Sequence, residues 1–214
     1  DMTERNHERL QTARSLMMTT KSIDQLCDQY KIDTIDFLKT DAEGHEYAII
    51  HGCTRPVLMI ESEVYFHPIR EDVPLFDRLM TLLRERGYMP LDVKRIYWNP
   101  DVSSKIQNYY SKGLLIMGDA VFLLDPFMEQ NRVHFAQAER RHHYFSLLAL
   151  YGYGDLICLA AEHFANRGIM SQEEKAETMT LVQAGFSDHP KLPLLIGKMV
   201  RRVLLVVEQF IKLP

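Results

Sequence analysis

The stretch from residue 35 to residue 61 limits the fold most strongly, because its periodicity changes twice. Ile35–Lys39 is a short apolar run rich in β-branched and aromatic residues, which is typical of a strand buried on both faces of a parallel sheet. A helical pattern follows over residues 44–51, and Gly52 is a plausible end for it. A second apolar run, Val57–Ile60, comes next. Strand, helix and strand within about 30 residues predict a βαβ unit and an α/β fold.

More strand and helix patterns follow in the same part of the chain. Apolar residues recur with helical spacing after Pro74, and Arg86 and Gly87 end that pattern. Two β-rich segments, Tyr88–Val93 and Ala120–Leu124, come after it and are separated by a polar stretch rich in tyrosine. A hairpin or a pair of edge strands fits these two segments.

From Phe127 onward the period is almost entirely helical. Helical patterns cover residues 132–151, 156–167 and 193–213. Ser171 and Glu174 form the pattern of a capping box for one further helix. The last segment is expected to pack on a core, the alternative being a partner-binding or membrane-surface helix. We therefore predict two domains, residues 1–126 and an all-helical extension over residues 127–214.

Composition narrows the class of protein. The chain has 214 residues, of which 46% are hydrophobic and 25% charged, as expected for a globular protein. A net charge of -4 argues against a nucleic-acid partner. We find no uncharged apolar run of about 18 residues, so we predict no membrane span. The three cysteines are far apart and fit no zinc spacing, which favours a reduced, cytoplasmic setting.

Charged side chains follow both strands of the predicted βαβ unit. Lys39, Asp41 and Glu43 come after the first strand, and Glu61 and Glu63 come after the second. Ligands of open α/β sheets bind outside the carboxyl ends of the strands, so these side chains are expected to face a substrate.

Each acid also has an ordinary structural explanation. Asp41 and Glu43 stand at a helix start, where a carboxylate binds free N–H groups and complements the helix dipole. Glu61 fits an ion pair with Lys39 or with Arg55. The residue pattern alone leaves both interpretations open.

Four short motifs occur in a fixed order in this region. They are Thr20-Lys21-Ser22-Ile23-Asp24, IDFLKTDAEGHE over residues 35–46, Ile50-His51-Gly52 and PVLMIE over residues 56–61. This order resembles the FkbM family of S-adenosylmethionine-dependent methyltransferases. That family shows a T-L-D-like element, a strand ending in K-x-D-x-E-G-x-E, a helix ending near a glycine, and a strand ending in glutamate. The resemblance covers roughly residues 17–126, and its first element reads S-I-D here.

The resemblance implies a Rossmann-like class I methyltransferase sheet whose central strand ends at the methyl donor. Methyl transfer requires donor and acceptor in line, and a carboxylate can accept the acceptor's proton. We expect Asp41 nearest the donor and acceptor, with Glu43 beside it as a second cofactor-binding acid. Glu61 is expected across the strand ends, with Lys39 and His45 as further candidates for catalysis. The alternative for His45 is a surface residue of the helix start. No metal is predicted, although three carboxylates are suitable ligands.

One departure from the family concerns the donor-binding half. The family's glycine-rich turn and ribose-binding acid are not found in this sequence, and the close glycines Gly152 and Gly154 lie far downstream. We therefore predict that the chain is the C-terminal half of the methyltransferase domain followed by the helical extension. We also predict that this chain is inactive on its own. The chain is then a fragment of a longer protein, a half-domain completed by another chain or a homo-oligomer, or a degenerate relative.

The acceptor implied by the resemblance is a hydroxyl of a glycan, a lipid or a small molecule. The competing hypothesis is a non-catalytic protein that binds a partner through its helical region. There, the basic and aromatic residues 140–145 are either a phosphate or glycan patch or a solvated helix face. Four aromatic residues near the predicted hairpin either line an acceptor site or cover the sheet's edge: Tyr97, Trp98, Tyr109 and Tyr110.

Overall fold

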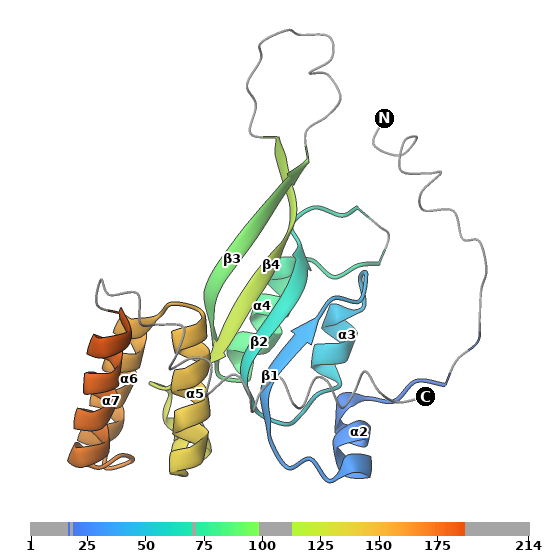
Figure 1. Cartoon of the computed structure of the whole chain (residues 1–214). Helices are drawn as coiled ribbons and strands as arrows, with labels where there is room; N and C mark the ends of the chain where they lie inside the picture. The colour runs from blue at the N-terminus through green and yellow to red at the C-terminus, as the bar shows by residue number, and fades with distance from the viewer. Residues whose placement is uncertain (1–16, 18, 70–71, 99–112, 187–214) are drawn as a thin grey trace, which may run out of the picture. The chain divides into compact units, whose positions relative to one another are not determined.

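The computed structural model describes residues 17, 19–69, 72–98 and 113–186 (Figure 1). The chain divides into two compact units, Asp1–Leu123 and Leu124–Pro214. The predicted helix over residues 193–213 and the tyrosines Tyr109 and Tyr110 lie outside the described residues.

The first unit is built on a four-stranded sheet with the order β1-β2-β4-β3 (Figure 1). Its strands are β1 (Ile35–Thr40), β2 (Val57–Tyr65), β3 (Tyr88–Trp98) and β4 (Leu114–Leu124). Strands β1 and β2 are parallel, whereas β2 and β4 are antiparallel. The predicted α/β class and the parallel strand pair of the βαβ unit are confirmed.

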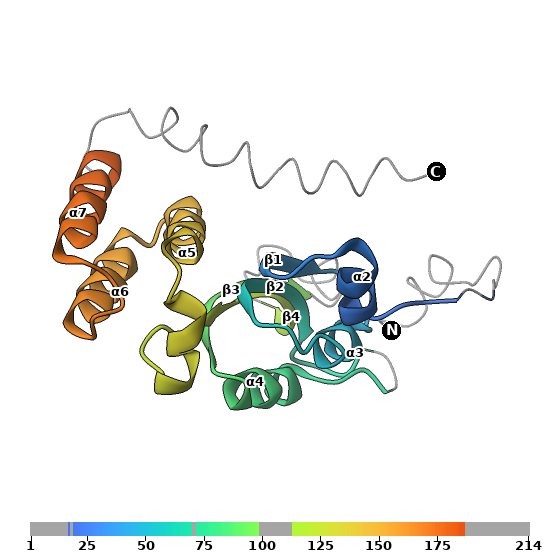
Figure 2. The ribbon, with the colours of Figure 1, turned by 90° about the horizontal axis from the view of Figure 1, so that it is seen from below.

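Three helices accompany this sheet: α2 (Ile23–Tyr30), α3 (Glu46–His51) and α4 (Phe76–Glu85). Helix α3 connects β1 to β2, and Figure 2 shows α3 and α4 on the same side of the strands. Phe76 of α4 stacks on Phe122 of β4 with ring centroids 6.2 Å apart. Leu79 and Leu83, one turn apart on α4, are buried, as the helical spacing predicts.

Strand β1 differs from the prediction of a strand buried on both faces. Ile35, Phe37 and Leu38 are only half-buried, because β1 is the outermost strand on its side of the described sheet. Strand β2 lies inside the sheet instead, and its residues 57–60 are at most 3% exposed.

Strand β2 is also longer than predicted. It continues to Tyr65, so Glu61 and Glu63 lie within the strand rather than after it. The reason is its pairing with β4, whose register runs without interruption from Met59 opposite Leu123 to Tyr65 opposite Met117. The antiparallel neighbour thus extends β2 beyond the end of β1.

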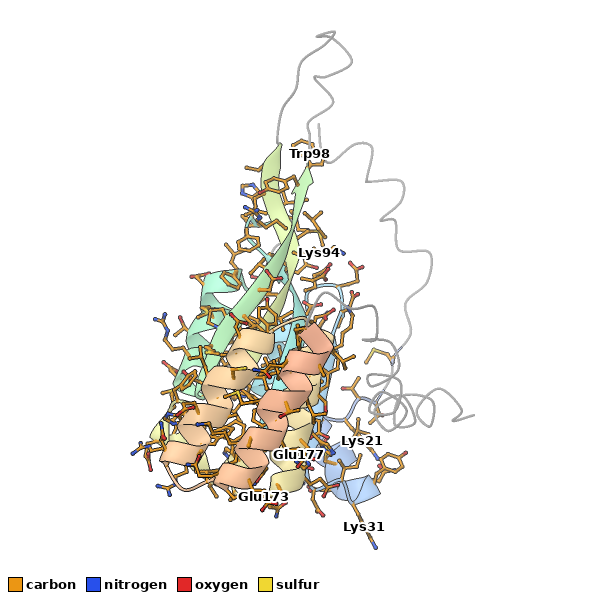
Figure 3. All side chains as sticks on the ribbon, turned by 60° about the vertical axis from the view of Figure 1, so that its left-hand side comes forward. Lys21, Lys31, Lys94, Trp98, Glu173 and Glu177 are labelled. Atoms are coloured by element: carbon orange, nitrogen blue, oxygen red, sulfur yellow. The ribbon has the colours of Figure 1, made fainter. Side chains whose placement is uncertain are left out.

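The second unit is helical in its described part. Its elements are the 3-10 helix η2 (Glu129–Phe135), α5 (Ala138–Leu150), α6 (Gly154–Asn166) and α7 (Gln172–Phe186). The aromatic rings of Phe135, Tyr144 and Phe164 form its core, with Phe135 centred 4.9 Å from each of the other two. The exposed side of α7 carries Glu173 and Glu177, one turn apart (Figure 3).

The predicted single helix over residues 132–151 is wrong, because the chain breaks between η2 and α5. Gln137 is extended there, with a ψ of 133°. Nη1 of Arg141 donates to the carbonyl oxygens of Phe135 and Ala136, at 2.8 and 2.9 Å. These hydrogen bonds satisfy carbonyl groups at the end of η2 and so stabilise the break.

Candidate active site

Lys39 and Glu61 meet at the carboxyl end of β1. They are register partners on the parallel strands β1 and β2. Nζ of Lys39 lies 2.6 Å from Oε1 of Glu61. The hydrogen bond to Glu61 is the main cause that raises the pKa of Lys39, and the charges of Glu61, Asp119 and Asp41 act in the same direction. This ion pair joins the two strands directly before the candidate site.

The loop after β1 is held by Glu46, the first residue of α3. Glu46 is 3% exposed as a residue, and its carboxylate accepts hydrogen bonds from the N–H groups of Ala42, at 2.6 Å, and Gly44, at 3.0 Å. Glu43 and Gly44 have φ angles of +53° and +106°, in the region that side chains rarely adopt. A buried carboxylate that binds two backbone N–H groups stabilises such a turn, so Glu46 fixes the shape of the loop.

The side chains of Asp41, Glu43 and His45 are exposed. His45 precedes α3 and makes no capping hydrogen bond through its side chain. Its Nδ1 lies 3.3 Å from the carbonyl oxygen of Ala42. The loop therefore presents two carboxylates and one imidazole to solvent at the end of β1.

Glu63 and Tyr65 form a pair at the carboxyl end of β2. The hydroxyl of Tyr65, which is 2% exposed as a residue, donates a hydrogen bond to Oε2 of Glu63. Burial raises the pKa of Glu63, the hydrogen bond from Tyr65 lowers it, and the carboxylates of Glu46, Asp41 and Glu43 raise it, with a net increase. Burial and the Glu63 carboxylate raise the pKa of Tyr65 above its ordinary value, so its hydroxyl is a hydrogen-bond donor to Glu63 at neutral pH and well above it.

A shallow hollow opens beside this pair. Glu46 and Glu63 form its acidic side, and Phe76 and Leu79 of α4 contribute apolar lining. The hollow has room for about one water-sized group, which suits a hydroxyl rather than a whole ligand.

Contacts between α2 and the segment after α3 support the candidate site. Asp24 of α2 accepts hydrogen bonds from the N–H and the hydroxyl of Thr54, at 2.9 and 2.6 Å. Its carboxylate lies 3.9 Å from Nε of Arg55, which also contacts Asp28. The S-I-D element of the sequence therefore connects α2 to the segment that leads into β2.

Arg86 closes the other end of α3. Its guanidinium donates to the carbonyl oxygens of Ile50, Cys53 and His51, at 2.8, 2.9 and 3.0 Å. These carbonyls belong to the last turn of the helix and to the turn after it, where backbone acceptors lack helical partners. Arg86 thus ties the end of α4 to the end of α3.

Residues 2–90 match the methyltransferase FkbM domain. This FkbM segment contains β1, α3, β2 and α4 and extends into β3. It confirms the predicted resemblance to this methyltransferase family for this part of the chain. The matched range differs from the predicted one, which ran from residue 17 to residue 126. Comparisons with curated proteins and with solved structures give no match.

Within the FkbM segment, the structure joins some of the predicted site residues. Lys39 and Glu61 are in contact, and this confirms the predicted ion-pair alternative for Glu61. Asp41 and Glu43 influence Glu63 through their charges, whereas His45 is exposed. The roles of the predicted residues in catalysis and cofactor binding stay predictions.

Sequence reasoning missed three residues of the FkbM segment. Glu46 is the last letter of the K-x-D-x-E-G-x-E element, and that position was the available signal for its role. Glu63 was noted as an acid after the second strand but was not selected as a site residue. No sequence signal pointed to Tyr65, because its role depends on the length of β2.

The described residues contain no group of three or more His, Cys, Asp or Glu side chains that could hold a metal ion. Among the described helices, none is long and apolar enough to cross a membrane.

Proposed function

We propose that this chain is the acceptor-side half of an S-adenosylmethionine-dependent methyltransferase. Its acceptor is a hydroxyl of a glycan, a lipid or a small molecule. The observation that carries the proposal is the βαβ unit of the FkbM segment, where exposed carboxylates follow β1 beside the Lys39–Glu61 pair. Ligands of open α/β sheets bind at this end of parallel strands.

The side chains at this end suit the charge of the methyl donor. S-adenosylmethionine, when bound, supplies a methyl group on a positively charged sulfonium. Asp41 and Glu43 are exposed acids, and negative charge near a cation favours its binding. We therefore assign Asp41 to the donor and the acceptor, and Glu43 to the donor beside it. Lys39 and Glu61 flank them, and His45 is a further candidate at the loop.

The nucleotide part of the donor is assigned to protein outside this chain. The first glycine of the sequence is Gly44, so no glycine-rich turn precedes β1 here. A turn of that kind followed by a helix N-terminus is the usual binding site for such a group in Rossmann-like folds. We propose that a further segment or a partner chain supplies it.

Donor binding tests the role of Asp41. In a polypeptide of the length found in its source, the Asp41→Asn substitution should weaken S-adenosylmethionine binding about 10- to 100-fold. This factor corresponds to the loss of a charged contact that contributes about 1.5–3 kcal/mol. S-adenosylhomocysteine lacks the sulfonium charge, so its affinity should change less. Isothermal titration calorimetry with both compounds measures this difference.

The control is Asp33→Asn, which removes an exposed carboxylate at the opposite end of β1. It should leave both affinities unchanged. Equal affinity of wild type and Asp41→Asn for the methyl donor would contradict the assignment of Asp41. Strong donor binding by residues 1–214 alone would contradict the half-domain proposal.

A further inference from the structure

Glu61 forms an ion pair, whereas only one carboxylate oxygen of Glu63 accepts a hydrogen bond from the described residues. The Glu61 carboxylate forms the 2.6 Å ion pair with Lys39, so one of its oxygens is already bound to a cation. Glu63 is the next acid along β2, one residue beyond Ser62, where the register with β1 ends. Its Oε2 accepts the hydrogen bond from Tyr65, and its Oε1 has no hydrogen-bond partner among the described residues.

The surroundings of Glu63 suit a proton acceptor. It lines the hollow that has room for one hydroxyl-sized group. Tyr65 fixes the orientation of the carboxylate, and Phe76 and Leu79 make part of the lining apolar. Three further acids act on Glu63 through their charges: Glu46 of α3, and Asp41 and Glu43 of the loop after β1. Both burial and these negative charges favour protonation of Glu63.

We propose that Glu63, oriented by Tyr65, accepts the proton of the acceptor hydroxyl during methyl transfer. This inference rests on the proposed function and names the base of that reaction. The acceptor O–H bond breaks, and its proton passes to Oε1 of Glu63. The electron pair on the acceptor oxygen forms the new bond to the methyl carbon. The bond between that carbon and the sulfur of the sulfonium donor breaks, and its electron pair goes to sulfur.

The first measurement is independent of turnover. Carbon-13 NMR of the Glu63 carboxyl, in the full chain labelled on glutamate, follows its titration. The pKa should lie above the ordinary value for glutamate, and Tyr65→Phe should raise it further, because the variant removes the hydrogen bond that lowers it. An ordinary pKa that does not respond to Tyr65→Phe overturns the inference.

The second measurement is turnover by the native polypeptide. S-adenosylmethionine is supplied with methyl glucoside, octanol and a low-mass extract of the source cells as acceptor probes, and formation of S-adenosylhomocysteine is followed. Glu63→Gln should lower kcat about 10²- to 10⁴-fold, as expected for loss of a general base, with an unchanged Kd for the donor. In Tyr65→Phe the acidic limb of the kcat profile should move to higher pH, together with the NMR pKa.

Asp77→Asn is the matched control, because Asp77 is an exposed carboxylate in the first turn of α4 and follows Phe76, which lines the hollow, in the sequence. Turnover of Glu63→Gln at the rate of Asp77→Asn overturns the role of Glu63 while the proposed function stands. An inactive wild type that does not bind the donor overturns the proposed function and this inference with it.

Discussion

Asp24 stabilises the contact between α2 and the segment that leads into β2. Burial alone would raise its pKa, but the hydrogen bonds from Thr54 and the contacts with Arg55 lower it overall. A carboxyl group with a lowered pKa in the folded state stabilises that state when it is ionised. This stabilisation is fully present above the pKa of the unfolded chain, and it is lost as pH falls through the lower folded value.

Replacing Asp24 should therefore cost stability in a pH-dependent way. Asp24→Asn leaves the N–H of Thr54 with a weaker acceptor and removes the charge beside Arg55, for an expected loss of about 1–3 kcal/mol at pH 7. The difference from wild type should shrink as the medium is acidified below pH 3.8, the ordinary pKa of the group. Urea unfolding at several pH values measures it, with Asp33→Asn as the control. A constant difference across this range would contradict the ionic explanation.

Gly44 is a second residue whose role depends on backbone geometry. Its φ of +106° is unfavourable for any side chain, and an added Cβ would lie 2.9 Å from Cγ2 of Val73. Gly44→Ala should therefore distort the loop held by Glu46 and destabilise the first unit by about 1–3 kcal/mol. Thermal unfolding measures the loss, and Gly152→Ala is the comparison, since that glycine also has a positive φ but open space around it. Equal losses would show that contact with Val73 does not matter.

Among the secondary-structure elements, the Arg141–Glu174 pair connects η2, α5 and α7. The Arg141 side chain is 5% exposed and Nη2 lies 2.6 Å from Oε2 of Glu174. Ser171 accepts the hydrogen bond from the N–H of Glu174, as the capping-box pattern predicts. The Glu174 carboxylate binds Arg141 from α5, so this acid joins two helices.

Replacing only one residue of the Arg141–Glu174 pair should lower the free energy of unfolding. Arg141→Leu leaves the Glu174 carboxylate half-buried without its cation and leaves two carbonyl groups without a donor, for a loss of about 3–5 kcal/mol in the second unit. The double variant Arg141→Leu with Glu174→Leu should lose less, because no unpaired charge remains. Urea unfolding of both variants compares them. A double variant less stable than Arg141→Leu would contradict this account.

The elements also show where sequence reasoning succeeds. Periodicity predicted the strand at Ile35, the helix after Pro74 and the helix ending near Arg167, because each has its own apolar pattern. The break before α5 was missed, since it depends on Arg141 reaching back to two carbonyl groups. The length of β2 was missed because β4, which extends it, begins only at Leu114, far along the chain from the end of β2 at Tyr65. The site residues stay predictions, and the proposal of Glu63 in place of Glu61 as the base depends on the contact between Lys39 and Glu61, which the sequence left open.

At the scale of the whole molecule, the two units each have a core of their own. Leu58 and Phe122 are fully buried in the first, and Phe135 and Tyr144 are fully buried in the second. The match to the FkbM domain falls within the first unit. The half-domain proposal therefore applies to the first unit and assigns no role to the helical unit.

The half-domain proposal makes a prediction about mass. The polypeptide isolated from its source should exceed the 25.0 kDa of this chain by about 11 kDa or more, enough for the roughly 100 residues of a missing βαβαβ half. Intact-mass spectrometry measures it. A mass of 25.0 kDa would instead require a second chain, which cross-linking followed by size-exclusion chromatography should reveal; a lone monomer of that mass would contradict the proposal.

Arg86 has a consequence for how related chains can diverge. It recognises three carbonyl oxygens, and every amino acid carries the same carbonyl group. The exposed side chain of His51 can therefore change during evolution without loss of the contact, whereas a change at Arg86 removes three hydrogen bonds at once. Lysine is a poor replacement, because it lacks the planar fork that reaches several acceptors. Among homologues, we expect the residue at position 51 to vary while the arginine that holds this turn persists.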